Sequence, residues 1–143
     1  MTVYKEYFMP ELFPTGLMRK EFDILIKCSK NASAFSIDEL TDKTDLYFDK
    51  IKSAHKENPM VNVNLACAIV SSIHAIHADW RNIPEMAKPW CKGMIQYFIE
   101  TADEDDDFLS PTGFDDDAAV LNACLKLADR ADLCIDPEDY DEC

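Results

Sequence analysis

Glycine and long apolar runs are scarce in this chain, and each scarcity excludes a class of protein. Only 3 of the 143 residues are glycine, although β-rich and loop-rich folds use glycine freely at their turns. No stretch approaches the roughly 20 consecutive apolar residues that a membrane span needs. The segment from Met1 to Gly16 carries charges and two prolines, and it has no apolar core of signal-peptide length. We therefore expect a helical, soluble, cytoplasmic protein with no membrane role.

Sequence motifs for nucleophilic catalysis and for phosphate binding are also missing. There is no G-x-S-x-G, no glycine-rich phosphate loop and no C-x-x-C pair. Four of the 6 cysteines fall inside predicted helices, where a reduced thiol packs as a small apolar group. We expect these four in the core: Cys28, Cys67, Cys91 and Cys124. Cys134 and Cys143 lie in an acidic tail, where we expect exposed thiols whose pKa is raised by neighbouring carboxylates.

Two histidines on one predicted helix raise the question of a zinc site. His74 and His77 are three residues apart and share a face of that helix. Cys67 lies two turns before His74, roughly 10 Å along the axis, which is too far for one ion to bind both. We interpret the pair as ordinary half-buried histidines and expect no catalytic residues and no cofactor.

Positive charge is nearly absent from the last third of the chain. From Met1 to Ile99 twelve acids balance twelve bases, whereas from Glu100 to Cys143 sixteen acids face only Lys126 and Arg130. That second segment therefore carries the whole net charge of −14. Such an asymmetry predicts repulsion from nucleic acid and from anionic lipid, and attraction to cations or to a basic protein surface.

Helical periodicity divides the rest of the chain into about five segments. They cover residues 17–31, 37–57, 63–80, 84–99 and 115–128. The residues predicted to face inward include Met18 in the first segment, the stripe Leu65, Ile69, Ile73, Ile76 and Trp80 in the third, and Val120, Leu121, Cys124, Leu125 and Ala128 in the last. Ser36 and Glu39 form a capping box before the second segment, and Pro89 predicts either a kink or a late start in the fourth. We predict an all-α, compact bundle over residues 1–128, with an acidic loop before the last helix and an acidic C-terminal tail at 129–143. Within that tail a short turn is expected to pack Leu133 and Ile135.

The region around the acidic loop resembles a known family. Its pattern is Pro84, Ala87 and Lys88, then Tyr97-Phe98-Ile99, Asp103, Asp107-Phe108-Leu109, Gly113-Phe114 and Asp116-Asp117-Ala118. This pattern is similar to the YkvA-like domain, a short bacterial helical family of unassigned function, and aligns without a gap over residues 84–125. Glu104, Asp105 and Asp106 stand where that family has apolar residues and a proline. The resemblance implies a helical fold and brings no established activity.

The acidic residues give two functional hypotheses. The first is a non-catalytic adaptor or inhibitor that binds a basic protein partner, with a DNA mimic of bacterial or phage origin as its narrower form. Its predicted interaction residues are Glu104, Asp105, Asp106, Asp115, Asp139, Asp141 and Glu142. The alternative is a divalent-cation site for Ca²⁺ or Mg²⁺, with or without hydrolytic activity. Its predicted ligands are Asp103, Asp107, Asp116 and Asp117.

Overall fold

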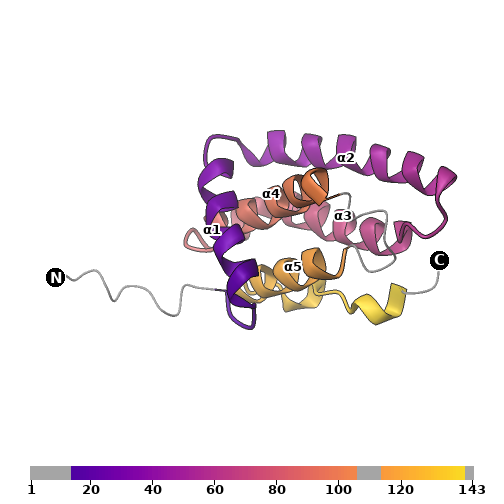
Figure 1. Ribbon diagram of the computed structural model, residues 1–143. Coiled ribbons are helices and arrows are strands. Elements are labelled where there is room, and N and C mark those ends of the chain that lie inside the picture. The colour runs from indigo at the N-terminus through magenta and orange to yellow at the C-terminus, as the bar shows by residue number, and fades with distance from the viewer. Residues whose placement is uncertain (1–13, 106–113, 141–143) are drawn as a thin grey trace.

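Five α-helices pack around one apolar core in the computed structural model, which describes residues 14–105 and 114–140 (Figure 1). Side chains are described for residues 14–100 and 114–140. The helices are α1 (Arg19–Ala32), α2 (Ile37–Glu57), α3 (Val63–Ala78), α4 (Lys88–Asp105) and α5 (Asp115–Leu127), with short 3-10 helices η2 (Trp80–Asn82), η4 (Ala131–Leu133) and η5 (Pro137–Tyr140). No strand occurs in the described ranges, and the predicted all-α bundle is confirmed.

The helix starts follow local chemistry that the sequence already contains. The Ser36 amide donates to Glu39 Oε1 at 2.8 Å and the Glu39 amide donates to Ser36 Oγ at 3.1 Å, which confirms the predicted capping box. Pro89 lies in the first turn of α4, where a missing N–H costs no helical hydrogen bond. Of the two alternatives predicted for Pro89, a kink or a late start, the structure has the late start: residues 85–87 form a turn, and α4 begins only after them.

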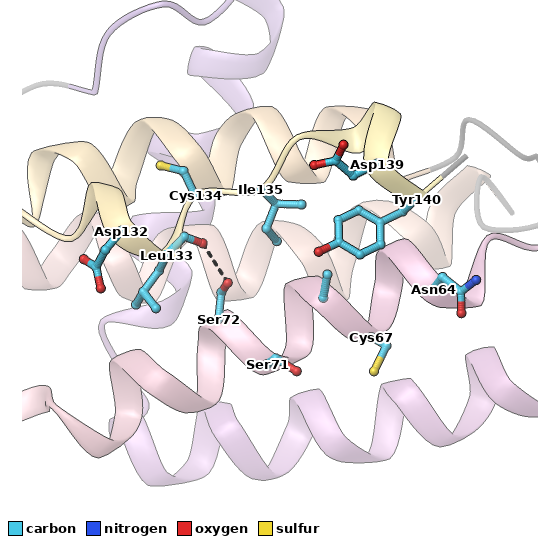
Figure 2. Close-up of a pocket in the computed structure, with 11 residues that line it drawn as sticks. Asn64, Cys67, Ser71, Ser72, Asp132, Leu133, Cys134, Ile135, Asp139 and Tyr140 are labelled. Atoms are coloured by element: carbon cyan, nitrogen blue, oxygen red, sulfur yellow. Dashed lines mark hydrogen bonds between the residues drawn. The ribbon is translucent and has the colours of Figure 1, made fainter. Parts of the chain in front are cut away.

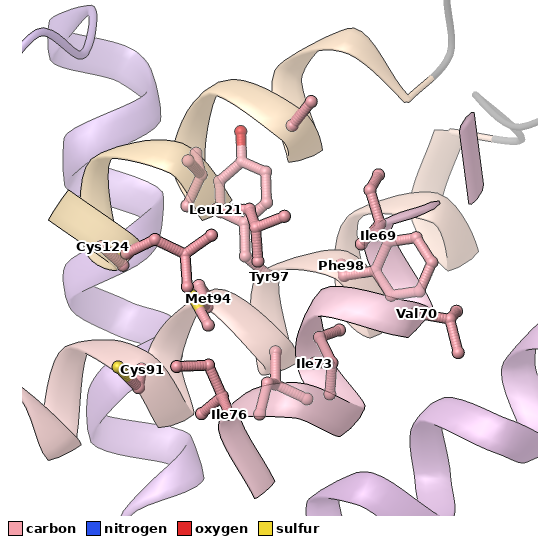
Figure 3. Packing of buried hydrophobic residues seen from close by; sticks show 14 of the residues in the cluster. Ile69, Val70, Ile73, Ile76, Cys91, Met94, Tyr97, Phe98, Leu121 and Cys124 are labelled. Atoms are coloured by element: carbon pink, nitrogen blue, oxygen red, sulfur yellow. The ribbon is translucent and has the colours of Figure 1, made fainter. Parts of the chain in front are cut away.

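The core receives buried side chains from all five helices, and Figure 3 shows its part between α3, α4 and α5. The predicted stripe on α3 is buried from Leu65 to Ile76, and Trp80 at its end is partly buried. Phe98 of α4 joins two neighbours: its ring meets Tyr47 edge-on at 5.1 Å between centroids and Phe114 at 6.0 Å. Full burial of such side chains contributes roughly 1.5–3 kcal/mol each, so this apolar contact dominates the stability of the bundle.

Three local predictions are wrong. Met18 was expected on the inner face of the first helix but is 66% exposed, because α1 begins only at Arg19. Cys67 was expected in the core but is exposed on α3, whereas Cys28, Cys91 and Cys124 are buried as predicted. Residues 103–105 were assigned to a loop, yet they continue α4 to Asp105. Residues 106–113, which hold the rest of that predicted loop, lie outside the described residues.

The segment after α5 turns back onto the bundle. Asp129 has a left-handed backbone (φ 63°), the Asp129 amide bonds Lys126 O at 3.1 Å, and the Arg130 amide bonds Leu125 O at 2.8 Å. These two bonds form a Schellman motif, which ends α5 and reverses the chain. Ile135 is 7% exposed, and Leu133, Cys134 and Tyr140 are partly buried against the core, so the segment after α5 contacts the helices through these residues.

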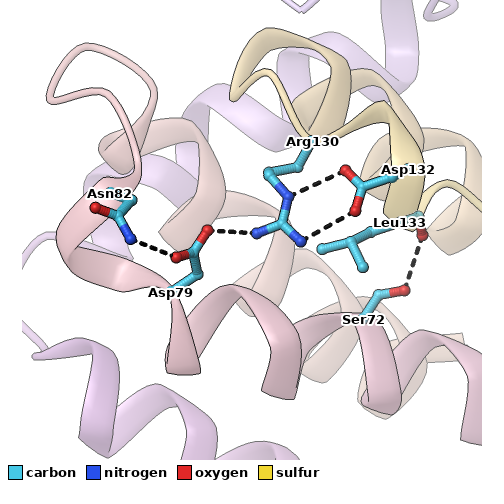
Figure 4. A network of polar contacts seen from close by, with 6 residues as sticks. All are labelled: Ser72, Asp79, Asn82, Arg130, Asp132 and Leu133. Atoms are coloured by element: carbon cyan, nitrogen blue, oxygen red, sulfur yellow. Dashed lines mark hydrogen bonds and ion pairs between the residues drawn. The ribbon is translucent and has the colours of Figure 1, made fainter.

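Polar contacts fix this C-terminal segment in place. Arg130 binds Asp79 of the α3 end and both carboxylate oxygens of Asp132, the latter at 3.0 Å each (Figure 4). Ser72 Oγ donates to Leu133 O at 2.9 Å. Within the described ranges, no helix is long and apolar enough to cross a bilayer.

Candidate functional site

The predicted acidic site residues occupy different environments where the structure describes them. At the start of α5, Asp115 is half-buried, Asp116 is exposed and Asp117 is only 5% exposed. Several predicted residues have side chains outside the described ranges: Asp103, Glu104, Asp105, Asp106, Asp107, Asp141 and Glu142. The four-aspartate metal site therefore stays a prediction. Among the described side chains, no three histidines, cysteines or carboxylates are grouped to hold a metal ion.

The beginning of α5 meets a buried carboxyl group from α1. Glu21 is 9% exposed, and its Oε1 accepts a hydrogen bond from the Met18 amide at 3.1 Å. Burial raises the pKa of Glu21, and the adjacent Asp116 carboxylate raises it further. Burial likewise raises the pKa of Tyr97, with Asp117 and Asp116 adding to the shift. The first turn of α5 thus creates a locally anionic environment at the junction of α1, α4 and α5.

Glu21→Gln should stabilise the protein at pH 7. Because the folded-state pKa of Glu21 is raised, the fold favours the protonated carboxyl, and this contribution is lost as the pH rises through that folded pKa. Glutamine keeps an oxygen for the Met18 amide and can donate to Asp116. We expect about 0.5–1.5 kcal/mol of added stability at pH 7, the scale of one hydrogen bond, measured by urea unfolding.

The matched control is Glu39→Gln, the same substitution at the third residue of α2, where the carboxylate likewise accepts from the amide of the residue before the helix. Glu39 is exposed and accepts from Ser36 N, so its replacement should change stability by no more than about 0.5 kcal/mol. The gain of Glu21→Gln should shrink as the pH falls through the raised pKa of Glu21 and reach its minimum by about pH 4, where the carboxyl is protonated in both the folded and the unfolded state. A gain that is constant with pH, or equal losses of stability in both variants, would contradict a raised pKa of Glu21 in the folded protein.

Both histidines of α3 pair with carboxylates of α2. His74 Nε2 lies 2.7 Å from Asp45 Oδ1, and His77 Nε2 lies 2.6 Å from Asp38 Oδ1. The pairs are at least partly exposed, so they tie two helices together across the surface. Each imidazole lies beside a different carboxylate; His77 is half-buried as expected, whereas His74 is exposed.

The thiols divide into buried and accessible groups. Burial raises the pKa of Cys91 to about 12 and holds that of Cys124 well above its usual value. The pKa of Cys134 is also raised, but burial is the main cause and the Asp132 carboxylate a lesser one, so the predicted carboxylate effect is secondary. Cys67 is the exposed thiol among the described residues; Cys143 lies outside them.

The C-terminal segment presents a packed acidic surface. Residues 129–140 contain five acids and one base. The guanidinium of Arg130 lowers the pKa of Asp132, because it hydrogen-bonds the ionised form. The remaining acids of this segment are exposed: Asp129, Asp136, Glu138 and Asp139. Since Arg130 is taken by Asp79 and Asp132, no base inside the segment neutralises these four carboxylates.

A groove of about 530 Å³ separates this segment from α3 (Figure 2). The α3 side is lined by Asn64, Cys67, Ala68, Ser71 and Ser72, and the opposite side by Asp132, Leu133, Cys134, Ile135, Asp139 and Tyr140. Figure 2 shows the Tyr140 ring reaching from η5 toward α3, with Asp139 above it and Cys67 and Asn64 on the helix below. Among the residues that the structure describes, no lysine or arginine lines the groove.

Of the groove residues, sequence reasoning singled out only Asp139 as an interaction residue. Cys67 was assigned to the core, and Tyr140 had no signal that placed it beside α3. The spacing Asn64, Cys67, Ser71 does follow one helix face at steps of three and four. That polar face was the available sign that this side of the otherwise apolar α3 meets a solvent-filled groove.

Comparisons of the chain with protein-family models, with curated proteins and with solved structures give no match.

Proposed function

We propose that this protein is a non-catalytic acidic adaptor or inhibitor that binds a basic surface of another protein. The observation that carries the proposal is the segregation of charge: the first 99 residues are neutral and the last 44 carry −14. A negative electrostatic potential over one part of a molecule attracts basic partners and repels nucleic acid and anionic lipid. The YkvA-like resemblance stays a prediction about the family and adds no activity.

The packing of residues 129–140 supports this proposal. An acidic tail that moved freely would have to be ordered on binding, which reduces affinity. Here the Schellman turn, the Arg130 contacts and the burial of Ile135 hold four exposed carboxylates on a folded scaffold. A basic partner would therefore meet a surface whose geometry is already set.

Binding of a fluorescent oligoarginine peptide to the full chain tests the proposal. We expect affinity to fall by at least about tenfold between roughly 0.05 and 0.5 M salt, because exposed charges are screened over about a Debye length. An oligoglutamate peptide of the same length should not bind. Absence of oligoarginine binding at low salt, or binding that salt leaves unchanged, would refute a charge-based partner surface.

Two triple variants with the same change in charge localise the effect. Asp136→Asn/Glu138→Gln/Asp139→Asn neutralises the C-terminal surface and should weaken peptide binding. Asp42→Asn/Asp49→Asn/Glu57→Gln neutralises three exposed acids of α2, where lysines balance them, and should have a smaller effect. Equal losses would mean that only total charge matters and that residues 129–140 are not the binding surface.

A further inference from the structure

The groove between α3 and residues 131–140 combines three features that match a long cationic side chain. Its volume offers room for one extended side chain and part of a backbone, since ligand pockets of about 300–1,000 Å³ hold small ligands. Its middle is apolar, with Ala68, Leu133 and Ile135 available to an aliphatic stem. Its ends are polar and acidic.

The charged group at the η5 end of the groove is a carboxylate, so this end attracts cations. Asp139 is exposed, and no ion pair joins it to another described residue. Beside it, the Tyr140 ring presents an aromatic face above α3 (Figure 2). A carboxylate next to an aromatic ring is a typical environment for a guanidinium, which can stack on the ring and bond the carboxylate with two N–H groups. Across the groove, Asn64 and Ser71 make the α3 side polar.

We propose that this groove binds an arginine side chain from the basic partner, with Asp139 and Tyr140 holding the guanidinium. The inference rests on the proposed function and names the contact by which it is achieved. Lysine should bind less well, because its ammonium group cannot stack on Tyr140 or form the paired bonds. Asp132, at the other end of the groove, is already bound to Arg130, which shows how carboxylates of this segment accept a guanidinium.

Cys67 is a native reporter for occupancy of the groove. Cys67 is exposed and is one of the residues that line the groove on the α3 side. N-ethylmaleimide, a neutral reagent, would alkylate it, and peptide mass mapping separates Cys67 from Cys134 and Cys143. A cation held near but outside the groove would favour the reactive thiolate and speed this reaction. A side chain inside the groove would block the reagent from Cys67. The alkylation rate therefore rises in the first case and falls in the second.

We expect oligoarginine to slow Cys67 alkylation in the full chain. At a peptide concentration of roughly ten times its Kd, the rate should fall to about one tenth, because about one chain in eleven is then free. Oligolysine of the same length, compared at equal concentration, should protect Cys67 less. Equal protection by both peptides would overturn the arginine-specific contact, and an unchanged or increased rate with bound oligoarginine would overturn the groove as the site.

Single substitutions test the two residues that hold the guanidinium. Asp139→Asn and Tyr140→Leu should each weaken oligoarginine binding by roughly five- to tenfold, the range for a charge-assisted or cation–π contact. Asp136→Asn is the matched control, since Asp136 lies in the same segment and outside the groove, and it should weaken binding by less than about twofold. Circular dichroism checks that each variant is folded; equal effects of Asp139→Asn and Asp136→Asn would refute the groove.

The two proposals fail in distinguishable ways. If oligoarginine binds with salt-sensitive affinity but leaves Cys67 alkylation unprotected, the acidic surface binds basic partners elsewhere and only the groove is refuted. If oligoarginine does not bind at all, the proposed function is refuted together with the groove.

Discussion

Replacing Gly93 by alanine should lower the free energy of unfolding by about 2–3 kcal/mol, the range for overpacking a core. Gly93 lies where α4 passes α1, and a Cβ built at this position would be 2.1 Å from Ser29 Oγ and 3.1 Å from both Ser29 Cα and Ser29 Cβ. A rotation of the serine side chain could move the oxygen but not Cα. The two helix backbones would have to separate.

The sign of this effect is diagnostic. In the interior of a helix without neighbours, glycine to alanine normally stabilises by about 1 kcal/mol. A loss at Gly93 therefore reports the close approach of α1 and α4 rather than helix propensity. Separation of these helices would also disturb the stacked rings of Phe22 and Trp90, whose centroids are 5.9 Å apart, and the contact of Asn31 with Glu100.

A double-mutant cycle with Ser29→Gly provides the control. Ser29→Gly alone should cost about 1 kcal/mol, because glycine weakens α1. It also removes both side-chain atoms that would clash with the methyl group introduced by Gly93→Ala. The stability loss of the double variant should therefore be smaller than the summed losses of the two single variants by at least about 1 kcal/mol, as expected for residues in contact. Strict additivity, or a stabilising Gly93→Ala, would show that the helices do not approach this closely.

The parts of the fold that could be predicted from sequence are those set by local signals. The Ser36 capping box, the end of α2 before Asn58, and the start of α5 at Asp115 each depend on residues close together in the chain. The five residues predicted to face inward on α5, Val120, Leu121, Cys124, Leu125 and Ala128, are all buried, although Asp117, Ala118 and Ala123 are buried as well. Local chemistry thus predicts these boundaries and this inner face, whereas the end of α4 at Asp105 was not predicted.

The features that the sequence did not reveal arise where distant segments meet. Glu21 looks like an ordinary first-turn acid, but in the fold it is buried and lies beside Asp116 of α5. Gly93 shows no role until α1 is placed against α4. The exposure of Cys67 depends on a groove whose other wall comes from the far end of the chain. The pairings of Glu21 and Gly93 leave no periodic pattern, so no spacing rule could have identified them, whereas the groove left one sign, the polar spacing of Asn64, Cys67 and Ser71 on α3.

Asn122→Ala should release the C-terminal segment from the bundle. Asn122 of α5 binds the backbone of Ile135 twice: its Nδ2 donates to Ile135 O at 2.6 Å, and its Oδ1 accepts from Ile135 N at 2.8 Å. Alanine leaves both backbone groups without these partners. If the two groups stay buried, each missing hydrogen bond lowers the stability of the protein by about 1–3 kcal/mol. We expect a loss of about 2 kcal/mol or more, with the segment opening locally instead of keeping the unpaired groups buried.

Amide hydrogen exchange measures this opening directly. In Asn122→Ala, protection at residues 133–140 should fall by roughly thirtyfold for 2 kcal/mol, while α3 and α4 keep theirs. Asn82→Ala is the matched control: Asn82 makes one exposed hydrogen bond, to Asp79, and its loss should leave the segment protected. Unchanged exchange in Asn122→Ala would mean that burial of Ile135 alone holds the segment.

The same variant connects stability to binding. Residues 132–140 form one wall of the groove, so their release should separate Asp139 and Tyr140 from Asn64 and Ser71 on α3. Asn122→Ala keeps every charge of the acidic surface, because asparagine and alanine are both neutral. If the fixed geometry of the wall matters, oligoarginine should protect Cys67 poorly in this variant although net charge is unchanged. Full protection would show that charge alone, without the packed wall, is sufficient for binding.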